Sequence, residues 1–153
     1  MGLDLTAYSR LALLPEAFEL PEDRWDGPDT YINAYISHPS FRRAARGLSL
    51  GRVYMATPET ESFGWRGGSY GGYGLLRRNL ADFAGIEPLP KDEIHERTWE
   101  DNNQEKPFFE LFWFSDCEGT IGPETSAILL DDFSRFREEL VDAGAVPEWW
   151  IDA

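Results

Sequence analysis

The sequence is poor in several features, and each shortage excludes a class of protein. It has a single cysteine, Cys117, so no disulfide can form within the chain, which fits a reducing compartment. It has no run of about 18 apolar residues, the length that a membrane-spanning helix needs. Its start, "MGLDLTAYSR", has no basic residues before an apolar block, which argues against a signal peptide. Together these absences predict a cytoplasmic protein that does not enter a membrane.

Positive charge is scarce overall, but it is gathered in one part of the chain. The formal net charge is −14, and so acidic a protein repels duplex nucleic acid unless its basic residues cluster. Between Pro39 and Leu80 seven arginines stand against two glutamates, a balance of +5, which leaves −19 for the rest of the chain. This segregation indicates either ion pairs between the two parts or a basic pocket on an acidic body. Such a pocket suits a small anion, because arginine offers a planar fork to phosphate or carboxylate, and we expect no direct nucleic acid binding.

Four segments carry the pattern of β-strands. Alternation with period two in "GLDLTAYS" predicts a half-buried strand at the start of the chain. "YINAYIS" and "RVYMAT" predict two more strands, and the aromatic run "PFFELFWF" at Pro107–Phe114 predicts a buried central strand. Residues 14–30 hold three prolines and six acids, which predicts a surface excursion. "PSFRRAARGL" predicts a short helix or turn.

Two segments carry the pattern of helices. Leu76, Leu80 and Phe83 are spaced as one helical face, and Gly85 ends the pattern. A second helix is predicted from Pro123 to Ala143, with Gly122 as N-cap. Its predicted core stripe is Leu129, Phe133, Phe136 and Leu140, and its predicted water-facing residues are Asp131, Asp132, Arg135, Glu138 and Glu139. Strands and helices do not alternate strictly, so residues 1–153 are expected to form one α+β domain, with a mainly antiparallel sheet and two main helices, the C-terminal one longest.

The stretch Ser62–Leu80, "SFGWRGGSYGGYGLLRRNL", combines glycines, aromatic rings and arginines. Its spacing matches neither a Walker A loop nor a dinucleotide-binding fingerprint. Glycines still allow a close backbone approach to a ligand, and the start of the following helix presents unpaired N–H groups to an anion. One interpretation is a ligand site, with arginines on phosphate and tyrosines stacked on a base or sugar, and the other is a hairpin-to-helix connection whose tyrosines fill the core. The predicted ligand-binding residues here are Arg66, Ser69, Tyr70, Tyr73 and Arg77.

A second motif, "WFSDCEGTIG", lies between the aromatic run and the C-terminal helix. Chain that leaves a strand and enters a helix is a common place for a ligand site. Asp116 and Glu118 are two residues apart, and three roles are open to them: pairing with the arginines of the first motif, contacting a ligand, or catalysis with a metal. One cysteine and two histidines cannot supply the usual ligand set of zinc, so no resident metal or cofactor is predicted.

The chain also resembles a family of small proteins encoded by bacteriophages and prophages. The resemblance lies in "MGLDLTAYS" at the start, "GSYGGYGLLR" in the middle and "FSDCEGTIGPE" before the C-terminal helix. The chain departs from the family pattern at Gly71 and Gly74, where polar residues are more usual, and in a longer acidic stretch from Glu16 to Asp29. The resemblance implies phage origin, and therefore the cytoplasm of a host cell, but it implies no particular activity.

These observations support a leading hypothesis and two alternatives. The leading one is a phage accessory protein for counter-defence, which sequesters a small anionic, nucleotide-like ligand without catalysis. The first alternative is an inhibitor whose acidic surface mimics DNA and occupies a host defence nuclease. The second is a metal-dependent hydrolase that uses Asp116 and Glu118. Trp149 and Trp150 near the C-terminus leave a homo-oligomer open.

Overall fold

The computed structural model of the protein describes residues 2–22, 30–36, 42–86, 103, 105–112 and 119–146. The strands are β1 (Gly2–Tyr8), β2 (Ala12–Leu13), β3 (Tyr31–Asn33), β4 (Val53–Met55) and β5 (Ser62–Ser69). The helices are α1 (Tyr70–Phe83), α2 (Phe109–Phe112), α3 (Pro123–Arg135) and α4 (Arg137–Asp142). β1 pairs with β5, and β2, β4 and β3 form a second sheet in that order, with all pairs antiparallel. The fold is therefore α+β, as the sequence predicts.

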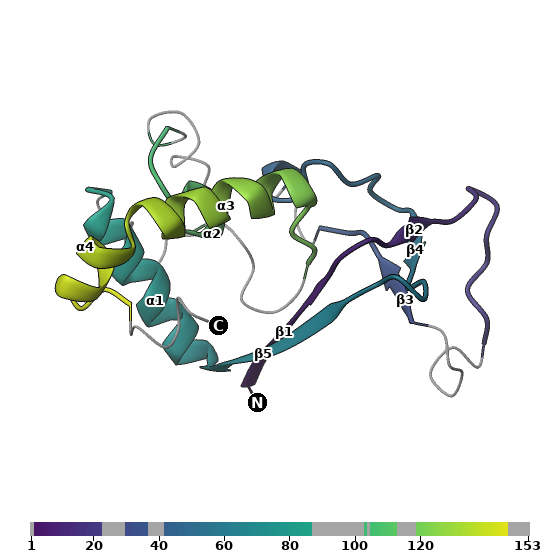
Figure 1. The fold of residues 1–153 in the computed structure, drawn as a ribbon, viewed down its shortest axis with the longest axis horizontal. Helices are drawn as coiled ribbons and strands as arrows, with labels where there is room; N and C mark the ends of the chain where they lie inside the picture. The colour runs from purple at the N-terminus through teal and green to yellow at the C-terminus, as the bar shows by residue number, and fades with distance from the viewer. Residues whose placement is uncertain are drawn as a thin grey trace, which may run out of the picture.

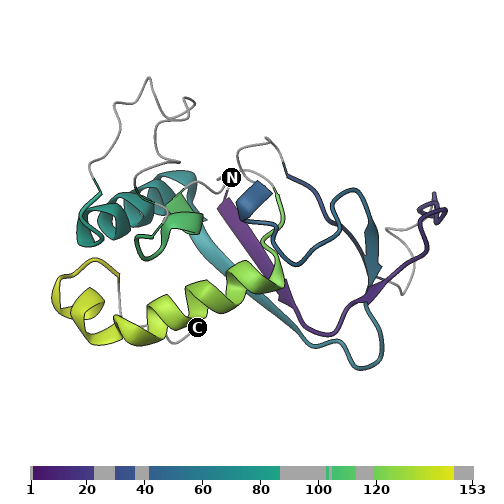
Figure 2. The same ribbon diagram turned by 90° about the horizontal axis from the view of Figure 1, so that it is seen from above.

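The elements are arranged along the long axis of the molecule. Figure 1 shows the helices at one end, the small β2–β4–β3 sheet at the other, and the β1–β5 ribbon running between them. Seen from above, α3 crosses over the ribbon while α1 continues directly from the end of β5 (Figure 2). The ribbon thus connects the helical end to the small sheet. Among the described residues, no helix is both long enough and apolar enough to cross a bilayer.

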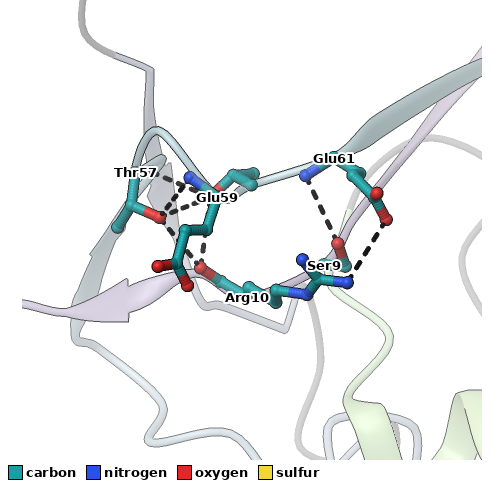
Figure 3. A network of polar contacts seen from close by, with 6 residues as sticks. Ser9, Arg10, Thr57, Glu59 and Glu61 are labelled. Carbon is teal, nitrogen blue, oxygen red and sulfur yellow. Dashed lines mark hydrogen bonds and ion pairs between the residues drawn. The ribbon is translucent and has the colours of Figure 1, made fainter.

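A polar corner holds the two sheets together where the chain passes between them twice (Figure 3). Ser9 and Glu61 exchange two hydrogen bonds, from Ser9 N to the Glu61 carbonyl at 2.9 Å and from Glu61 N to Ser9 Oγ at 3.3 Å. The hydroxyl of Thr60 donates to the Arg10 carbonyl at 3.1 Å, and Arg10 adopts a left-handed conformation with φ 54. The Arg10–Glu61 ion pair spans 3.8 Å between well-exposed side chains and contributes little to stability. The hydrogen bonds of the backbone and of the Ser9 and Thr60 hydroxyls, and not the ion pair, define this corner.

The hydrophobic core lies between the helices. Leu80 of α1 and Leu140 of α4 are fully buried, and Leu76 and Leu129 are nearly so. The predicted apolar faces of both helical segments are therefore confirmed. The centre of the core is Phe108, whose ring lies 4.9 Å from that of Phe133 and contacts two further rings, Phe83 and Phe136.

The aromatic run predicted as a central strand is a helix in its described part, so that prediction is wrong for residues 109–112. All residues from Phe108 to Leu111 are buried, Glu110 included, so the run has no alternation of buried and exposed positions that separates a strand from a short buried helix. A tertiary contact decides between them. The Asp132 carboxylate accepts a hydrogen bond from the Phe108 backbone N–H at 2.8 Å, and Phe108 turns the chain into α2 with a φ of 62. Asp132, predicted to face water, is for the same reason half-buried.

The C-terminal helical segment begins and ends where the sequence predicts, but it is interrupted. Gly122 is the N-cap of α3 and Pro123 its first residue, while Gly144 follows α4 with a φ of 64. Phe136, with φ −106 and ψ 16, separates the two helices. α3 and α4 together still form the longest helical stretch of the described chain.

The strands are shorter than predicted in the small sheet. β3 and β4 span three residues each, and β2 lies outside every predicted strand. β1 is a strand as expected, but Thr6 and Ala7 near its end are both exposed, so the predicted alternation does not bury one face there. A two-stranded ribbon leaves such residues in solvent where no third layer covers them.

Candidate functional site

An open pocket of about 420 Å³ lies beside the first turn of α3, and we call it the arginine pocket. It is lined by Arg42, Ala45, Arg46, Leu48, Ser49 and Leu50. These residues belong to the segment drawn in blue next to the start of α3 in Figure 1. The lining combines two guanidinium groups with aliphatic side chains, and its volume falls within the range of small-molecule sites, about 300–1,000 Å³. Both arginines of its lining belong to the basic segment between residues 39 and 80.

The local backbone explains how three arginines come together. Ala45 N bonds to the Arg42 carbonyl at 3.2 Å and Arg46 N to the Arg43 carbonyl at 3.4 Å, which are the i to i+3 contacts of a 3₁₀ turn. Side chains three residues apart in such a turn project in the same direction. Arg43 and Arg46 accordingly reach the same carboxylate oxygen, Glu110 Oε1, at 2.9 Å and 2.6 Å.

Glu110 is the buried anchor of this arrangement. It lies in α2, and its side chain is only 4% exposed. A carboxylate so deeply buried is tolerated because two guanidiniums bind it, and these bonds in turn restrain both arginines. The contact also confirms part of the ion-pair interpretation of the charge pattern, because the basic segment here pairs with an acid outside it.

Arg42 adds a guanidinium to the pocket that Glu110 does not contact. Of the three arginines of the turn, Arg43 and Arg46 bind Glu110, and Arg42 lines the pocket together with Arg46. Arg42 is exposed and makes no ion pair with any residue that the structure describes. In Arg46 the Nε atom is buried and has no hydrogen-bond partner within the described chain, so part of its donor capacity is unmet. Glu124, on the first turn of α3, is exposed and does not line the pocket.

The N-terminus of α3 contacts the backbone of the turn that carries the arginines. Gly122 N bonds to the Ala44 carbonyl at 2.8 Å, and the buried hydroxyl of Thr125 donates to the Arg43 carbonyl at 2.9 Å. Gly122 lies so close to the turn that a Cβ there would stand 2.0 Å from the Arg46 carbonyl oxygen. The backbone of this turn, residues 42–46 and hereafter the arginine turn, is therefore held by α3, and the side chains of Arg43 and Arg46 are held by Glu110 of α2.

Asp132, which is half-buried, is a second carboxylate near α2. Burial raises the pKa of Asp132 above its ordinary value of 3.8, and the nearby Glu110 acts in the same direction, while the hydrogen bond from Phe108 N lowers it. Burial is the main cause of the raised pKa, because it disfavours the charged carboxylate, and the like charge of Glu110 adds to it. Asp132 does not line the pocket, and its role is to hold the start of α2.

The glycine-rich stretch forms no separate loop. β5 ends at Ser69 and α1 begins at Tyr70, so the glycines are divided between strand and helix. In the backbone register of the β1–β5 ribbon, Arg66 lies opposite Asp4 and Ser69 lies opposite Gly2. The side chains of Arg66, Ser69 and Tyr70 lie outside what the structure describes. Tyr73 is 2% exposed, its hydroxyl lies 3.5 Å from the Leu111 carbonyl, and the guanidinium carbon of Arg77 stands 4.9 Å from its ring centroid. For Tyr73 the core interpretation of the motif is the one observed, because a ring so buried is closed to a stacked ligand.

The second motif is described only at its end. Asp116 and Glu118 lie outside the described residues, so their predicted pairing with Arg66 or Arg77 stays a prediction. Thr120 exchanges two hydrogen bonds with Tyr35 just after β3, from Thr120 N to the carbonyl at 3.0 Å and from Tyr35 N to Thr120 Oγ1 at 3.3 Å. Gly119–Gly122 thus runs against the arginine turn and the end of β3. Among described residues no three His, Cys, Asp or Glu side chains gather to hold a metal.

The arginine pocket is the site that our sequence reasoning did not place. The signal was present, because "FRRAARG" puts three arginines within five residues inside the +5 segment. The glycines and tyrosines of Ser62–Leu80 led to a predicted site in that stretch instead. What the sequence lacks is the partner: nothing in the apolar context of Glu110 shows that two of these arginines bind it.

Comparison with protein-family models, with curated proteins and with solved structures finds no match to this chain. The function is therefore inferred from the geometry and charge of the arginine pocket.

Proposed function

We propose that this protein binds a small anionic, nucleotide-like ligand in the arginine pocket and retains it without turning it over. The observation that carries the proposal is Arg42, an exposed guanidinium that makes no ion pair within the described part of the chain. It lines the pocket beside Arg46, which a buried carboxylate holds in place. An anion bound beside Arg42 would accept hydrogen bonds from a guanidinium that has no ion pair with any described residue. The aliphatic side chains of Ala45, Leu48 and Leu50 offer apolar contact to the rest of the ligand.

Retention without chemistry is the simpler role for this lining. The described lining contains a hydroxyl, Ser49, but no carboxylate, imidazole or thiol that would activate it or a water. The resemblance to phage-encoded proteins makes sequestration of a host defence signal the biological role that we propose. The predicted residues of the glycine-rich stretch and Asp116 with Glu118 would then belong to a neighbouring part of the site or to the scaffold.

A thermal-shift screen of the full chain against mononucleotides, dinucleotides and sugar phosphates tests the proposal. A ligand at 100 times its dissociation constant stabilises the folded state by about 2.7 kcal/mol, which a melting curve resolves easily. The stabilisation should disappear in Arg42→Gln and persist in Arg78→Gln. Arg78 is a matched control, because it is also exposed and contributes nothing to the pocket, yet its substitution makes the same change in charge. Equal shifts in both variants would place the ligand elsewhere.

A second candidate function has support from α3 and α4. These helices present a row of exposed acids, Glu124, Asp131, Glu138, Glu139 and Asp142. Such a surface favours the alternative in which the protein occupies the DNA-binding face of a host defence protein. Replacing Asp131, Glu138 and Glu139 with glutamine should abolish phage protection in a plating assay under that alternative. Under the ligand-binding proposal the same variant should protect as the parent does.

A further inference from the structure

We propose that the outer edge of β5 pairs with the same edge of a second copy of this chain, so that the protein forms a symmetric dimer. The two β1–β5 ribbons would then join into one antiparallel sheet. The inference is independent of the arginine pocket, because it concerns the ribbon that runs between the helices and the small sheet (Figure 1).

The ribbon is open to pairing with another chain. Within the described residues its two strands pair only with each other, and a two-stranded ribbon is marginally stable in water. The half of the ribbon near the polar corner is exposed on both strands, at Thr6, Ala7, Ser62, Phe63 and Gly64. An uncovered strand edge presents unpaired backbone groups, which are a template for a further strand.

The pairing register shows which backbone groups point outward from β5. Ser9 N bonds to the Glu61 carbonyl at 2.9 Å, so these residues form a hydrogen-bonded pair, and such pairs alternate with non-hydrogen-bonded pairs along an antiparallel ladder. Gly64, opposite Thr6, therefore lies at a non-hydrogen-bonded position, where its N–H and C=O point away from β1. Neither group bonds to a described residue outside the ribbon.

A bulge limits the part of β5 that can pair regularly. Beyond the pair formed by Asp4 and Arg66, β5 has one residue more than β1 before the ladder resumes. Residues 62–66 are therefore the regular stretch, between the polar corner and the bulge. Gly64 is the midpoint of that stretch, so a two-fold axis at Gly64 uses all of it.

The residues on either side of Gly64 make the stretch complementary to itself. Antiparallel pairing about Gly64 sets Phe63 of each copy opposite Trp65 of the other, at non-hydrogen-bonded positions, where side chains come closest. Aromatic pairs at such positions stabilise a sheet, and Phe63 is 51% exposed in the single chain, so it has surface left to bury. Arg66, the one charge of β5, falls opposite Ser62, so the pairing opposes no like charges although each chain carries −14.

Sedimentation velocity of the full chain at increasing concentration tests the inference. The single chain has a mass of 17.5 kDa, and we expect a reversible species of twice that mass. Gly64→Pro removes the outward N–H without breaking a hydrogen bond within the ribbon. Because the two copies of Gly64 face each other at the axis, the dimer loses a hydrogen bond from each copy, and its dissociation constant should rise by about tenfold.

Thr6→Pro is the matched control. Thr6 lies opposite Gly64 in the same ladder pair, so its N–H also points outward, but from the β1 edge. This variant should dimerise as the parent does. Both proline variants should keep the parental circular dichroism spectrum, because neither loses a hydrogen bond within the ribbon.

A second pair of variants keeps the test valid if proline disturbs the ribbon. Phe63 and Leu75 are both 51% exposed, and Leu75 lies on α1. Phe63→Ala should weaken the dimer by about tenfold, because it removes both aromatic pairs, and Leu75→Ala should leave it unchanged.

Three results would overturn the inference. The first is a chain that stays at 17.5 kDa at every concentration. The second is a dimer that Thr6→Pro dissociates and Gly64→Pro does not, because its interface would then be the β1 edge. The third is a dimer that neither Gly64→Pro nor Phe63→Ala weakens.

Discussion

A single methyl group at Gly122 should destabilise the protein and disable the arginine pocket. Gly122 has φ −83 and ψ 164, a conformation open to every residue, so Gly122→Ala introduces no backbone strain. The effect is purely steric. The added Cβ would stand 2.0 Å from the Arg46 carbonyl oxygen and 2.7 Å from the Ala45 carbonyl carbon. Both are backbone atoms, so no side-chain rotation relieves the contact.

The size of the destabilisation follows from how far the start of α3 and the arginine turn must move apart. An ordinary carbon–oxygen contact is at least about 3 Å, so the start of α3 and the arginine turn must move apart by about 1 Å. That movement breaks the bond from Gly122 N to the Ala44 carbonyl and strains the bond from Thr125 Oγ1 to the Arg43 carbonyl. Each buried polar group left unsatisfied costs about 1–3 kcal/mol, so we expect a loss of about 3 kcal/mol in the free energy of unfolding. Affinity for the anionic ligand that we propose should fall as well, because Arg42 and Arg46 lie on the displaced turn.

Urea denaturation followed by circular dichroism measures the first effect, and Gly74→Ala is the control. A Cβ at Gly74 meets nothing within 4 Å, and the residue lies inside α1. Because alanine favours a helix over glycine, that variant should gain about 0.5–1 kcal/mol. The same chemical change is thus expected to act in opposite directions at the two positions. A Gly122→Ala variant as stable as the parent would show that α3 does not contact the arginine turn as described.

Three further substitutions test the core and its buried polar groups. Leu140→Ala should lower the free energy of unfolding by about 2–5 kcal/mol because the side chain is fully buried, while Leu130→Ala, at a side chain 69% exposed, should change it by less than about 0.5 kcal/mol; similar urea midpoints for the two would mean that the helix faces are misplaced. Thr125→Val keeps the shape of a fully buried residue but removes its hydroxyl, and urea denaturation should show a loss of about 1–3 kcal/mol; an unchanged midpoint would show that the bond contributes nothing. Burial raises the folded-state pKa of Asp132 above 3.8, so the folded protein binds more protons than the unfolded chain just above that pH, and stability falls as the pH rises through the window between the two pKa values. Asp132→Asn should flatten that fall in melting temperatures recorded from pH 3.5 upward, and an unchanged slope would assign it to another group.

The helices were the most predictable part of the fold. The spacing of Leu76 and Leu80, and of Leu129 and Leu140, predicts buried faces that the structure confirms, because helical periodicity records which side of an element meets the core. Gly122 and Pro123 likewise mark a helix start through local backbone preference alone. Prediction failed at the aromatic run around Phe109, where Phe108 to Leu111 are all buried and show no alternation of buried and exposed positions.

The candidate site divides in the same way between composition and tertiary contact. The amino-acid sequence by itself determined that positive charge is concentrated between residues 39 and 80 of an acidic chain, since the charge of a side chain does not depend on the fold. Only the tertiary structure decided which arginines are neutralised and which are exposed. Glu110 is 64 residues from Arg46 in sequence, and its carboxylate reaches that guanidinium because Asp132 caps α2 and α3 docks on the arginine turn. Pairing at such a separation depends on how helices pack, which no local pattern encodes.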